Sequence, residues 1–327
     1  MRKTWREPGG GEGRRSHRFA RDSVSLRCTA RGEQLTKKTW RKLHDPLDNP
    51  HRRCSAWLGR VVCGDNTEVL SGFPDACIDL VVTSPPYDDL RTYGGHSWNF
   101  ETLAAQLVRV LKPGGVIVWV VGDMTEDGSE TGNAMRQALH LKDVCGLRLH
   151  DTMIYQKTGI PFPESARYNQ EWEYCFVMSK GKPKTFNQLR IPTTHKRNTP
   201  AATRQRDGTM QATKYETGKD DRARGNVWRY NTGFMRSSPD AIAFDHPAVF
   251  PEALAKDHIA SWSSPGDVVL DPFSGSGTTC KSAKELNRQW CGIEINPEYC
   301  AIAEARMSQD VLQLETCAMR PNDQAQR

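Results

Sequence analysis

Hydrophobic and polar residues follow two periods along this chain, and the changes between them divide it into strands and helices. Apolar runs of strand length occupy residues 57–63, 78–83, 116–121, 147–155, 173–178, 267–271 and 290–295. Apolar positions three and four apart predict helices over residues 66–72, 100–111, 133–145, 251–262, 278–286 and 297–307. Strands that alternate with helices predict an α/β fold with a mostly parallel sheet and helices on both faces.

Three segments lack this periodicity. Residues 1–55 are rich in Arg and Gly and predict a basic, disordered extension. Residues 308–327 predict a C-terminal tail after the last helix. Between residues 180 and 245, Thr, Asn, Arg, Lys and Gly dominate and apolar residues are sparse. This stretch, called the insert below, interrupts a single domain that we expect over residues 56–307.

Charge is distributed unevenly along the chain. Residues 1–55 contain 15 Lys and Arg against 6 Asp and Glu, and residues 180–236 contain 14 against 4. Because the whole chain carries only +6, the remaining residues are acidic overall. An acidic body with basic segments predicts a polyanionic partner that is contacted at defined places. For residues 1–55, a solvated tail without a partner is an equally good interpretation.

The composition also indicates the cellular compartment of the protein. The longest apolar runs have strand length, well short of the roughly 20 residues of a membrane-spanning helix. The Arg-rich N-terminus has no apolar stretch of the kind found in a secretory signal. The ten cysteines form no C-x-x-C pair, so zinc-finger spacing is absent and no metal site is predicted. We therefore expect a cytoplasmic protein with reduced cysteines.

A glycine-rich turn, D-P-F-S-G-S-G at residues 271–277, lies between a predicted strand and a predicted helix. Gly275 and Gly277 allow a ligand to approach the backbone at a helix N-terminus. Glu294 stands at the end of the following strand, where a carboxylate can accept hydrogen bonds from a ribose diol. Cys280 replaces the third glycine of a dinucleotide fingerprint, which favours an adenosine without a pyrophosphate. A simple tight turn is the alternative.

A second turn, S-P-P-Y at residues 84–87, ends the predicted strand at 78–83. Pro85 and Pro86 have fixed φ angles and no N–H, and Pro85 holds Ser84 in an extended conformation. The carbonyl groups of Ser84 and Pro85 are thus acceptors that are held in place before a ligand arrives. Tyr87 adds a flat aromatic face. This arrangement suits a planar ligand with an amino group, although Pro and Tyr are also common in ordinary strand-ending turns.

Together, these motifs resemble those of the amino-group DNA methyltransferases. T-S-P-P-Y at 83–87 is similar to their catalytic motif IV, D-P-F-S-G-S-G to motif I, and H-P-A-V-F-P at 246–251 to motif X. C-G-D at 63–65, L-K-P-G-G at 111–115 and E-Y-C-F-V-M-S-K-G at 173–181 resemble other framework motifs of the family. The resemblance covers about residues 56–307. Motif IV precedes the insert, and motifs X and I follow it, which is the circularly permuted order of the family's β class.

The resemblance implies a Rossmann-like S-adenosylmethionine-dependent methyltransferase fold, with a mostly parallel sheet of seven strands. It implies S-adenosyl-L-methionine as the cofactor and makes the insert the target-recognition region. The implied catalytic residues are Ser84, Pro85, Pro86 and Tyr87. The implied cofactor-binding residues are Asp65, His246, Pro247, Phe250, Pro251, Asp271, Phe273, Gly275, Gly277, Thr278 and Glu294. The expected DNA-binding residues are Arg91, Arg190, Lys196, Arg197, Arg204, Arg206, Lys214, Arg222 and Arg224.

The same resemblance implies a reaction on double-stranded DNA. The target base flips out of the duplex, and its amine takes the methyl group directly, without a covalent enzyme intermediate. Ser84 at the first position of motif IV is typical of cytosine-N4 enzymes, and N6-adenine methylation is the alternative. Cytosine-C5 methylation needs a Pro-Cys nucleophile, and the chain has no such pair. A cognate restriction endonuclease is a further partner that the family allows and the sequence leaves undecided.

Other classes of function explain fewer of these features. A nicotinamide oxidoreductase accounts for the glycine turn and Glu294 but not for S-P-P-Y or the basic insert. A catalytically silent DNA-binding protein accounts for the insert but leaves two intact motifs without a role. A methyltransferase acting on RNA or on protein glutamine shares a similar motif IV, and the permuted order and large insert count against it.

Overall fold

A mixed sheet lies at the centre of the computed structural model, which describes residues 56–86, 98–159, 167–193, 201–213 and 220–308. Within these residues the sheet has eight strands in the order β1-β14-β13-β2-β3-β7-β6-β12. All neighbouring strands are parallel except β7, which runs antiparallel to both β3 and β6. The strands are β1 Arg60–Cys63, β2 Ile78–Thr83, β3 Leu111–Val121, β6 Arg148–Lys157, β7 Trp172–Ser179, β12 Val227–Tyr230, β13 Val268–Asp271 and β14 Gln289–Glu294.

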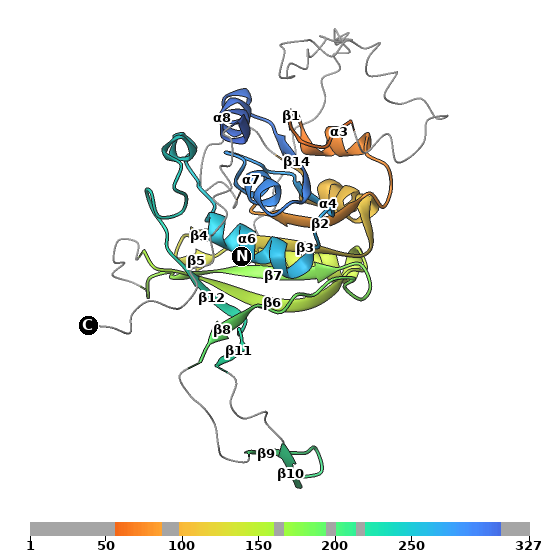
Figure 1. Ribbon diagram of the computed structural model, residues 1–327, viewed down its shortest axis with the longest axis vertical. Helices are drawn as coiled ribbons and strands as arrows, with labels where there is room; N and C mark the ends of the chain where they lie inside the picture. Colours follow the sequence, from red (N-terminus) through yellow and green to blue (C-terminus); the bar gives the residue numbers. More distant parts are fainter. Residues whose placement is uncertain (1–55, 87–97, 160–166, 194–200, 214–219, 309–327) are drawn as a thin grey trace, which may run out of the picture.

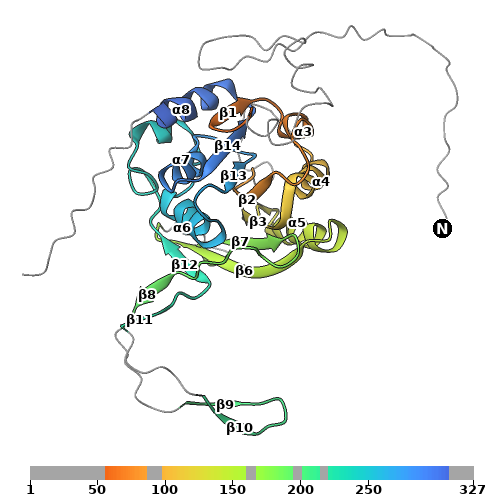
Figure 2. The ribbon, with the colours of Figure 1, turned by 45° about the vertical axis from the view of Figure 1, so that its right-hand side comes forward.

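Helices cover both faces of the sheet (Figures 1 and 2). Side-chain caps start two of them: Asp65 Oδ1 accepts from the backbone N–H of Thr67, and Asn99 Oδ1 accepts from that of Thr102, both at 2.9 Å. The helices are α3 Asn66–Ser71, α4 Phe100–Val110, α5 Asn133–Leu139, α6 Glu252–Trp262, α7 Thr278–Glu285 and α8 Pro297–Ser308, with a π-helical turn, η1, at His140–Val144 and a 3-10 turn, η2, at Ala241–Asp245.

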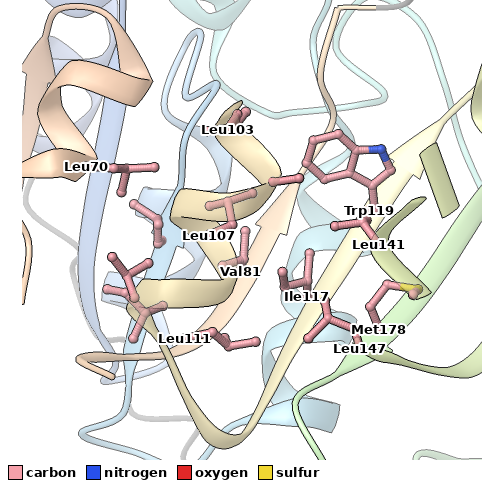
Figure 3. Packing of buried hydrophobic residues seen from close by; sticks show 14 of the residues in the cluster. Leu70, Val81, Leu103, Leu107, Leu111, Ile117, Trp119, Leu141, Leu147 and Met178 are labelled. Atoms are coloured by element: carbon pink, nitrogen blue, oxygen red, sulfur yellow. The ribbon is translucent and has the colours of Figure 1, made fainter. Parts of the chain in front are cut away.

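Alternate residues of the central strands face two separate cores. Val81 and Ile117 point to the side that α3, α4 and α5 cover, where they pack with Leu107 and the indole of Trp119 (Figure 3). Leu80 and Val118 point to the opposite side, where α6 and α7 cover them. These buried strands therefore lack the polar face of a half-exposed sheet, as expected for parallel strands between two helical layers.

The predicted elements are confirmed, with three local differences. The first strand begins only at Arg60, because residues 56–59 form a turn that ends at Gly59 with a φ of 70°. The P-G-G sequence after α4 does not precede β3 but lies within it, at an irregularity in its pairing with β2. The helix predicted at 133–145 is divided into α5 and the π-helical turn η1.

The insert contributes to the sheet, which the loss of periodicity did not predict. Its strand β12 pairs in parallel with β6, with Tyr230 opposite Lys157, and adds an eighth strand to the seven expected. The other described strands of the insert form two small antiparallel pairs: β8 Arg190–Pro192 with β11 Asp221–Ala223, and β9 Ala201–Arg204 with β10 Met210–Thr213. The β9–β10 hairpin projects away from the central sheet in both views (Figures 1 and 2).

Another two-stranded pair, β4 Thr125–Glu126 with β5 Ser129–Glu130, follows β3. Among the described residues, no helix is long and apolar enough to cross a membrane. The same residues contain no group of three or more His, Cys, Asp or Glu side chains suited to a metal ion. The predicted extension at 1–55 and almost all of the predicted tail lie outside the described residues.

Candidate active site

A cavity of about 1000 Å³ opens at the carboxyl ends of the parallel strands. Its lining residues include Glu294 and Asp65 at the ends of β14 and β1, Ser84 and Asp271 at the ends of β2 and β13, and Tyr155 on β6. Ligands of open α/β sheets bind at this edge, because the strands end there and the chain turns into loops. The volume is at the upper end of small-molecule pockets, which leaves room for a cofactor and a planar substrate side by side.

The two predicted motifs meet where β2 and β13 end side by side. Thr83, the last residue of β2, donates its hydroxyl to Asp271 Oδ1 at 2.7 Å, and the Phe273 N–H donates to the same oxygen at 3.1 Å. Burial raises the pKa of Asp271 to about 6, and the nearby Glu294 carboxylate acts in the same direction, whereas the two donors lower it. Asp271 thus joins the S-P-P-Y turn to the glycine turn.

The backbone of the glycine turn is held by the strand next to it. Ser274 N–H donates to the carbonyl oxygen of Ile293 at 2.9 Å, and Gly275 N–H donates to Glu294 Oε2 at 2.8 Å. Gly275 has a φ of 49°, and a Cβ at this position would lie 3.0 Å from His246 Nε2. The absence of a side chain therefore keeps this part of the cavity open, as a close ligand requires.

Glu294 has the position expected of a ribose-binding carboxylate. It ends β14 and lines the cavity, and its Oε1 accepts from Asn296 N–H at 2.9 Å while Oε2 holds Gly275. These two bonds orient the carboxylate, whose oxygens have about four lone-pair directions in all. Asp65 also lines the cavity, and it caps α3 at the same time.

The residues of motif X form another wall. His246, Pro247, Phe250 and Pro251 all line the cavity. Ala248 N–H donates to His246 Nδ1 at 3.1 Å, and the His246 ring packs edge to face against Tyr299 on α8. His246 is therefore a fixed part of the wall rather than a free loop histidine.

Most other predicted site residues lie on the same cavity. Ser84, Pro85, Pro86, Phe273 and Thr278 line it, and Phe273 packs against Trp98 with ring centroids 4.9 Å apart. Gly277 is not among the lining residues. Its φ is 80°, and a Cβ there would lie 3.0 Å from the Cβ of Ala303, so Gly277 makes room for α8. Tyr87 lies outside the described residues.

The cavity also holds residues that the motifs did not predict. Tyr155 and Lys157 from β6 and Glu173 from β7 line it, and Lys157 forms an ion pair with Glu173. Burial, followed by the Glu173 charge, raises the pKa of Tyr155, so its hydroxyl stays protonated. The alternation of β6 and β7 marked both strands, but only the sheet order shows that their ends reach the site.

The predicted DNA-binding arginines fall into two groups. Arg204, Arg206 and Arg222 are exposed on β9, its hairpin and β11. Arg190 pairs with Asp221 at 2.8 Å, and Arg224 pairs with Asp257 at 2.6 Å while it stacks over the Trp228 ring. Arg224 therefore holds the base of the insert against α6. Arg91, Lys196, Arg197 and Lys214 lie outside the described residues.

The residues present fit S-adenosyl-L-methionine. The glycine turn offers an open backbone at a helix start, where Gly275 leaves room that a side chain would fill. The Glu294 carboxylate is a group of the kind that accepts hydrogen bonds from a ribose, and aromatic and proline side chains also line the cavity. When bound, this cofactor supplies a methyl group activated by a sulfonium.

Comparisons with known proteins agree with this site. The family model described as DNA methylase, for N6 and N4 enzymes, matches residues 78–305. The chain is 52% identical over 243 residues to the orphan methyltransferase M.BamHII of Bacillus amyloliquefaciens, covering 73% of this chain and 91% of the relative.

Two solved structures share the fold. A DNA modification methylase of Thermus thermophilus complexed with S-adenosyl-L-methionine is 26% identical, covering 76% of this chain and 92% of that one, with a TM-score of 0.50. The cytosine-N4-specific PvuII DNA methyltransferase is 21% identical and shares the fold with a TM-score of 0.56, over 76% of this chain and 86% of its own. This chain therefore belongs to the N6/N4 amino-group DNA methylase family and is an S-adenosyl-L-methionine-dependent DNA methyltransferase.

Proposed function

We propose that this enzyme methylates the exocyclic N4 amine of cytosine in double-stranded DNA. The observation that carries the proposal is Ser84, which follows β2 directly and lines the cavity. A neutral hydroxyl stands there, at the position where a carboxylate or an amide is typical of N6-adenine enzymes. The bond from Thr83 to Asp271 anchors the residue just before it.

The S-P-P-Y turn can hold an amine without rearranging. Pro85 and Pro86 have no N–H, so neither proline competes as a donor for the carbonyl groups of Ser84 and Pro85. Two acceptors can bind the two hydrogens of an exocyclic amine and direct its lone pair away from them. Because the acceptors are in place before the base arrives, little reorganisation is needed at the moment of reaction.

Access to the cavity favours a base outside the duplex. Ser84 lies in a concave site on the sheet edge, and a base paired within a helix cannot enter it. Tyr155, Lys157 and Glu173 line the same cavity of about 1000 Å³, and we propose that such a base binds beside them. For Tyr87 we propose stacking on the flipped base, on the sequence alone. Wild-type turnover of a Tyr87→Ala variant on duplex DNA would show this role to be wrong.

The identity of the methylated base is measured directly. The protein is produced in a host without DNA methylation of its own, and the host DNA is digested to nucleosides and analysed by mass spectrometry. We expect N4-methylcytosine, which is absent from DNA of the same host carrying a Ser84→Ala variant. N6-methyladenine in place of N4-methylcytosine would overturn the cytosine assignment and leave the family assignment intact.

For Glu294 we propose binding to the cofactor ribose. A Glu294→Ala variant is expected to lose cofactor affinity, because both the ribose acceptors and the bond to Gly275 disappear. Calorimetric titration with S-adenosyl-L-methionine measures this, and unchanged affinity would refute the role.

For the insert we propose contact with the DNA backbone through its exposed arginines, in the cytoplasm where the DNA lies. A restriction endonuclease as a partner stays a prediction. The relative from Bacillus amyloliquefaciens is named an orphan methyltransferase, which favours action without one. Detection of nuclease activity in strains that lack only this protein would show that a partner exists.

A further inference from the structure

Arg306, in the last turn of α8, has a side chain that is 0% exposed. Its Nε donates to Asp240 Oδ2 at 3.1 Å, and its Nη2 donates to Glu252 Oε1 at 2.8 Å and to Ser238 Oγ at 3.3 Å. Ser238 and Asp240 belong to the last part of the insert, and Glu252 begins α6. One buried guanidinium therefore joins three segments that are distant in sequence.

The same guanidinium also reaches the glycine turn. Its Nη1 donates to the carbonyl oxygen of Ser276 at 2.6 Å, to Ser276 Oγ at 3.1 Å and to Thr278 Oγ1 at 3.0 Å. The two preceding residues of the turn are held by β14, through Ile293 and Glu294. Three successive residues of this loop are therefore held by distant partners: Ser274 and Gly275 by β14, and Ser276 by Arg306.

Lys281 provides a comparison, because its ammonium neutralises the same buried carboxylates, Asp240 and Glu252, as Arg306 does. Its Nζ lies 2.6 Å from Asp240 Oδ2 and 3.3 Å from Glu252 Oε1, the same two carboxylates that Arg306 contacts. Burial alone would raise the pKa of Asp240, but hydrogen bonds from Lys281 and Arg306 keep it below its usual value. Lys281 lies on α7 and pairs with these acids and with Glu285, whereas Arg306 also contacts the loop.

We propose that Arg306 is a positioning residue, which holds residues 274–278 in the conformation that binds the cofactor. It touches neither the reacting atoms nor the cavity, and it acts through the carbonyl of Ser276. The role requires a planar fork with five donors, because carboxylates on one side and the loop on the other must be held at once. A lysine at this position has one ammonium and cannot span both.

The test uses the full chain with three substitutions: Arg306→Lys, Arg306→Met and Lys281→Met. Cofactor affinity is measured by calorimetric titration without DNA, and stability by urea unfolding without cofactor. We expect Arg306→Lys to weaken cofactor binding about tenfold or more, since it loses a charge-assisted bond that shapes the site. The KM for the cofactor rises accordingly, and kcat at saturating cofactor changes by less than about threefold. Lys281→Met loses comparable stability and keeps its affinity within about twofold.

A second readout needs no cofactor. Hydrogen exchange of the backbone amides at residues 274–279 is expected to become faster in Arg306→Lys and to stay at the wild-type rate in Lys281→Met. If Arg306→Met does not accumulate as folded protein, Arg306→Lys decides the outcome. Unchanged cofactor affinity in Arg306→Lys would overturn the proposal. Losses of cofactor affinity in the Arg306 and Lys281 variants alike, each in proportion to the loss of stability, would also overturn it. Because the calorimetric titration and the hydrogen-exchange measurement contain no DNA, a wrong base assignment cannot produce either result.

Discussion

The glycine turn at residues 271–277 and the β9–β10 hairpin of the insert are both short, polar and glycine-containing, but they lie in opposite environments. Ser274, Ser276 and Thr278 are each 5% exposed or less, and distant residues bind them. In the hairpin, Arg206 and Asp207 are exposed, and a Cβ on Gly208 would meet no atom within 4 Å. The cofactor side is therefore built as part of the core, and the hairpin is built as a surface.

The contrast teaches that a residue type does not define its role. Arg306 is a buried anchor, Arg224 is an ion-paired clamp between the insert and α6, and Arg222 two positions earlier is exposed. Polar groups in the cofactor half carry large energies because an unpaired partner would remain buried. In the hairpin, water replaces any lost partner, and the same substitutions cost little stability.

The largest difference is expected between two aspartates. Asp271 ionises near pH 4 in the unfolded chain but has a pKa of about 6 in the folded protein. Between these values the folded state binds more protons, so rising pH lowers the free energy of unfolding, by about 3 kcal/mol in total. Relative to an Asp271→Asn variant, the wild type should therefore lose stability from about pH 4 to pH 6 and not above it. Urea unfolding without cofactor measures this difference.

The matched control is Asp207, which is fully exposed and whose pKa is lowered by hydrogen bonds from Thr209. An Asp207→Asn variant should show the same pH dependence of unfolding as the wild type between about pH 5 and 7, because the lowered pKa of Asp207 changes stability with pH only below this range. Parallel pH profiles for the wild type and Asp271→Asn would mean that the Asp271 carboxyl is not buried as described.

A somewhat smaller effect is expected from adding one methyl group to a glycine in each region. A Cβ on Gly292 of β14 would lie 2.6 Å from Ser274 Oγ and 2.8 Å from Cys280 Sγ, whereas one on Gly225 of the insert would meet nothing within 4 Å. Gly292→Ala should cost about 2 kcal/mol of stability and weaken cofactor binding, because it displaces the glycine turn. Gly225→Ala should change stability by less than about 0.5 kcal/mol. Thermal unfolding of both variants checks the pair, and equal costs would contradict the comparison.

Substitutions at Arg224 and Arg222 distinguish a residue that holds the insert against α6 from one that contacts DNA. Arg224→Gln loses the ion pair to Asp257, which Tyr230 also contacts at 2.6 Å, and the stacking on Trp228. Because Arg224 and Asp257 are partly exposed, we expect a cost of only about 1 to 2 kcal/mol. Arg222→Gln should leave the free energy of unfolding unchanged within about 0.5 kcal/mol and weaken DNA binding. Urea unfolding and DNA titration of both variants distinguish the two roles. Wild-type stability of Arg224→Gln would show that Arg224 does not hold the insert against α6.

The smallest effect on stability is expected at the hairpin. Replacing Arg204 and Arg206 by Gln should leave unfolding unchanged, since both side chains are exposed. If each neutralises one phosphate, the slope of log affinity against log salt should become shallower by about 0.9 per residue. Fluorescence titration of duplex DNA at several salt concentrations measures the slope. An unchanged slope would exclude both residues from backbone contact.

The sequence predicted most elements of the fold because period and caps are local properties. Strand β2 agrees with the apolar run at 78–83, and helix α4 agrees with the helical spacing at 100–111 to within a residue. Strand β12 was missed because V-W-R-Y is too short to show a period, and only its pairing with β6 makes it a strand. The P-G-G sequence predicted a break, but Gly114 and Gly115 form backbone hydrogen bonds with Lys180, just after β7, and the sequence lies within β3.

Site residues follow the same division. The sequence predicted that Ser84, Asp271, Gly275 and Glu294 belong to one site, because each stands at a strand end or a turn whose form depends on near neighbours, and all four line the cavity. Gly277 was assigned to the cofactor on the same grounds, but α8 packs where its side chain would be. Lys157 belonged to no motif, and Glu173 belonged to a motif that was assigned only to the framework. Their place in the cavity depends on the order of strands in the sheet.

By itself, the sequence determined the alternation of strands and helices, the stiff turn after β2 and the open backbone at Gly275. These follow from side-chain pattern, proline geometry and the missing Cβ of glycine, which act over a few residues. Only the tertiary structure decided that Thr83 would bind Asp271, 188 residues away, and that Arg306 would be buried against the glycine turn. The physical reason is that a charge or a hydroxyl can be buried only where its partners arrive, and those partners come from segments distant in the chain.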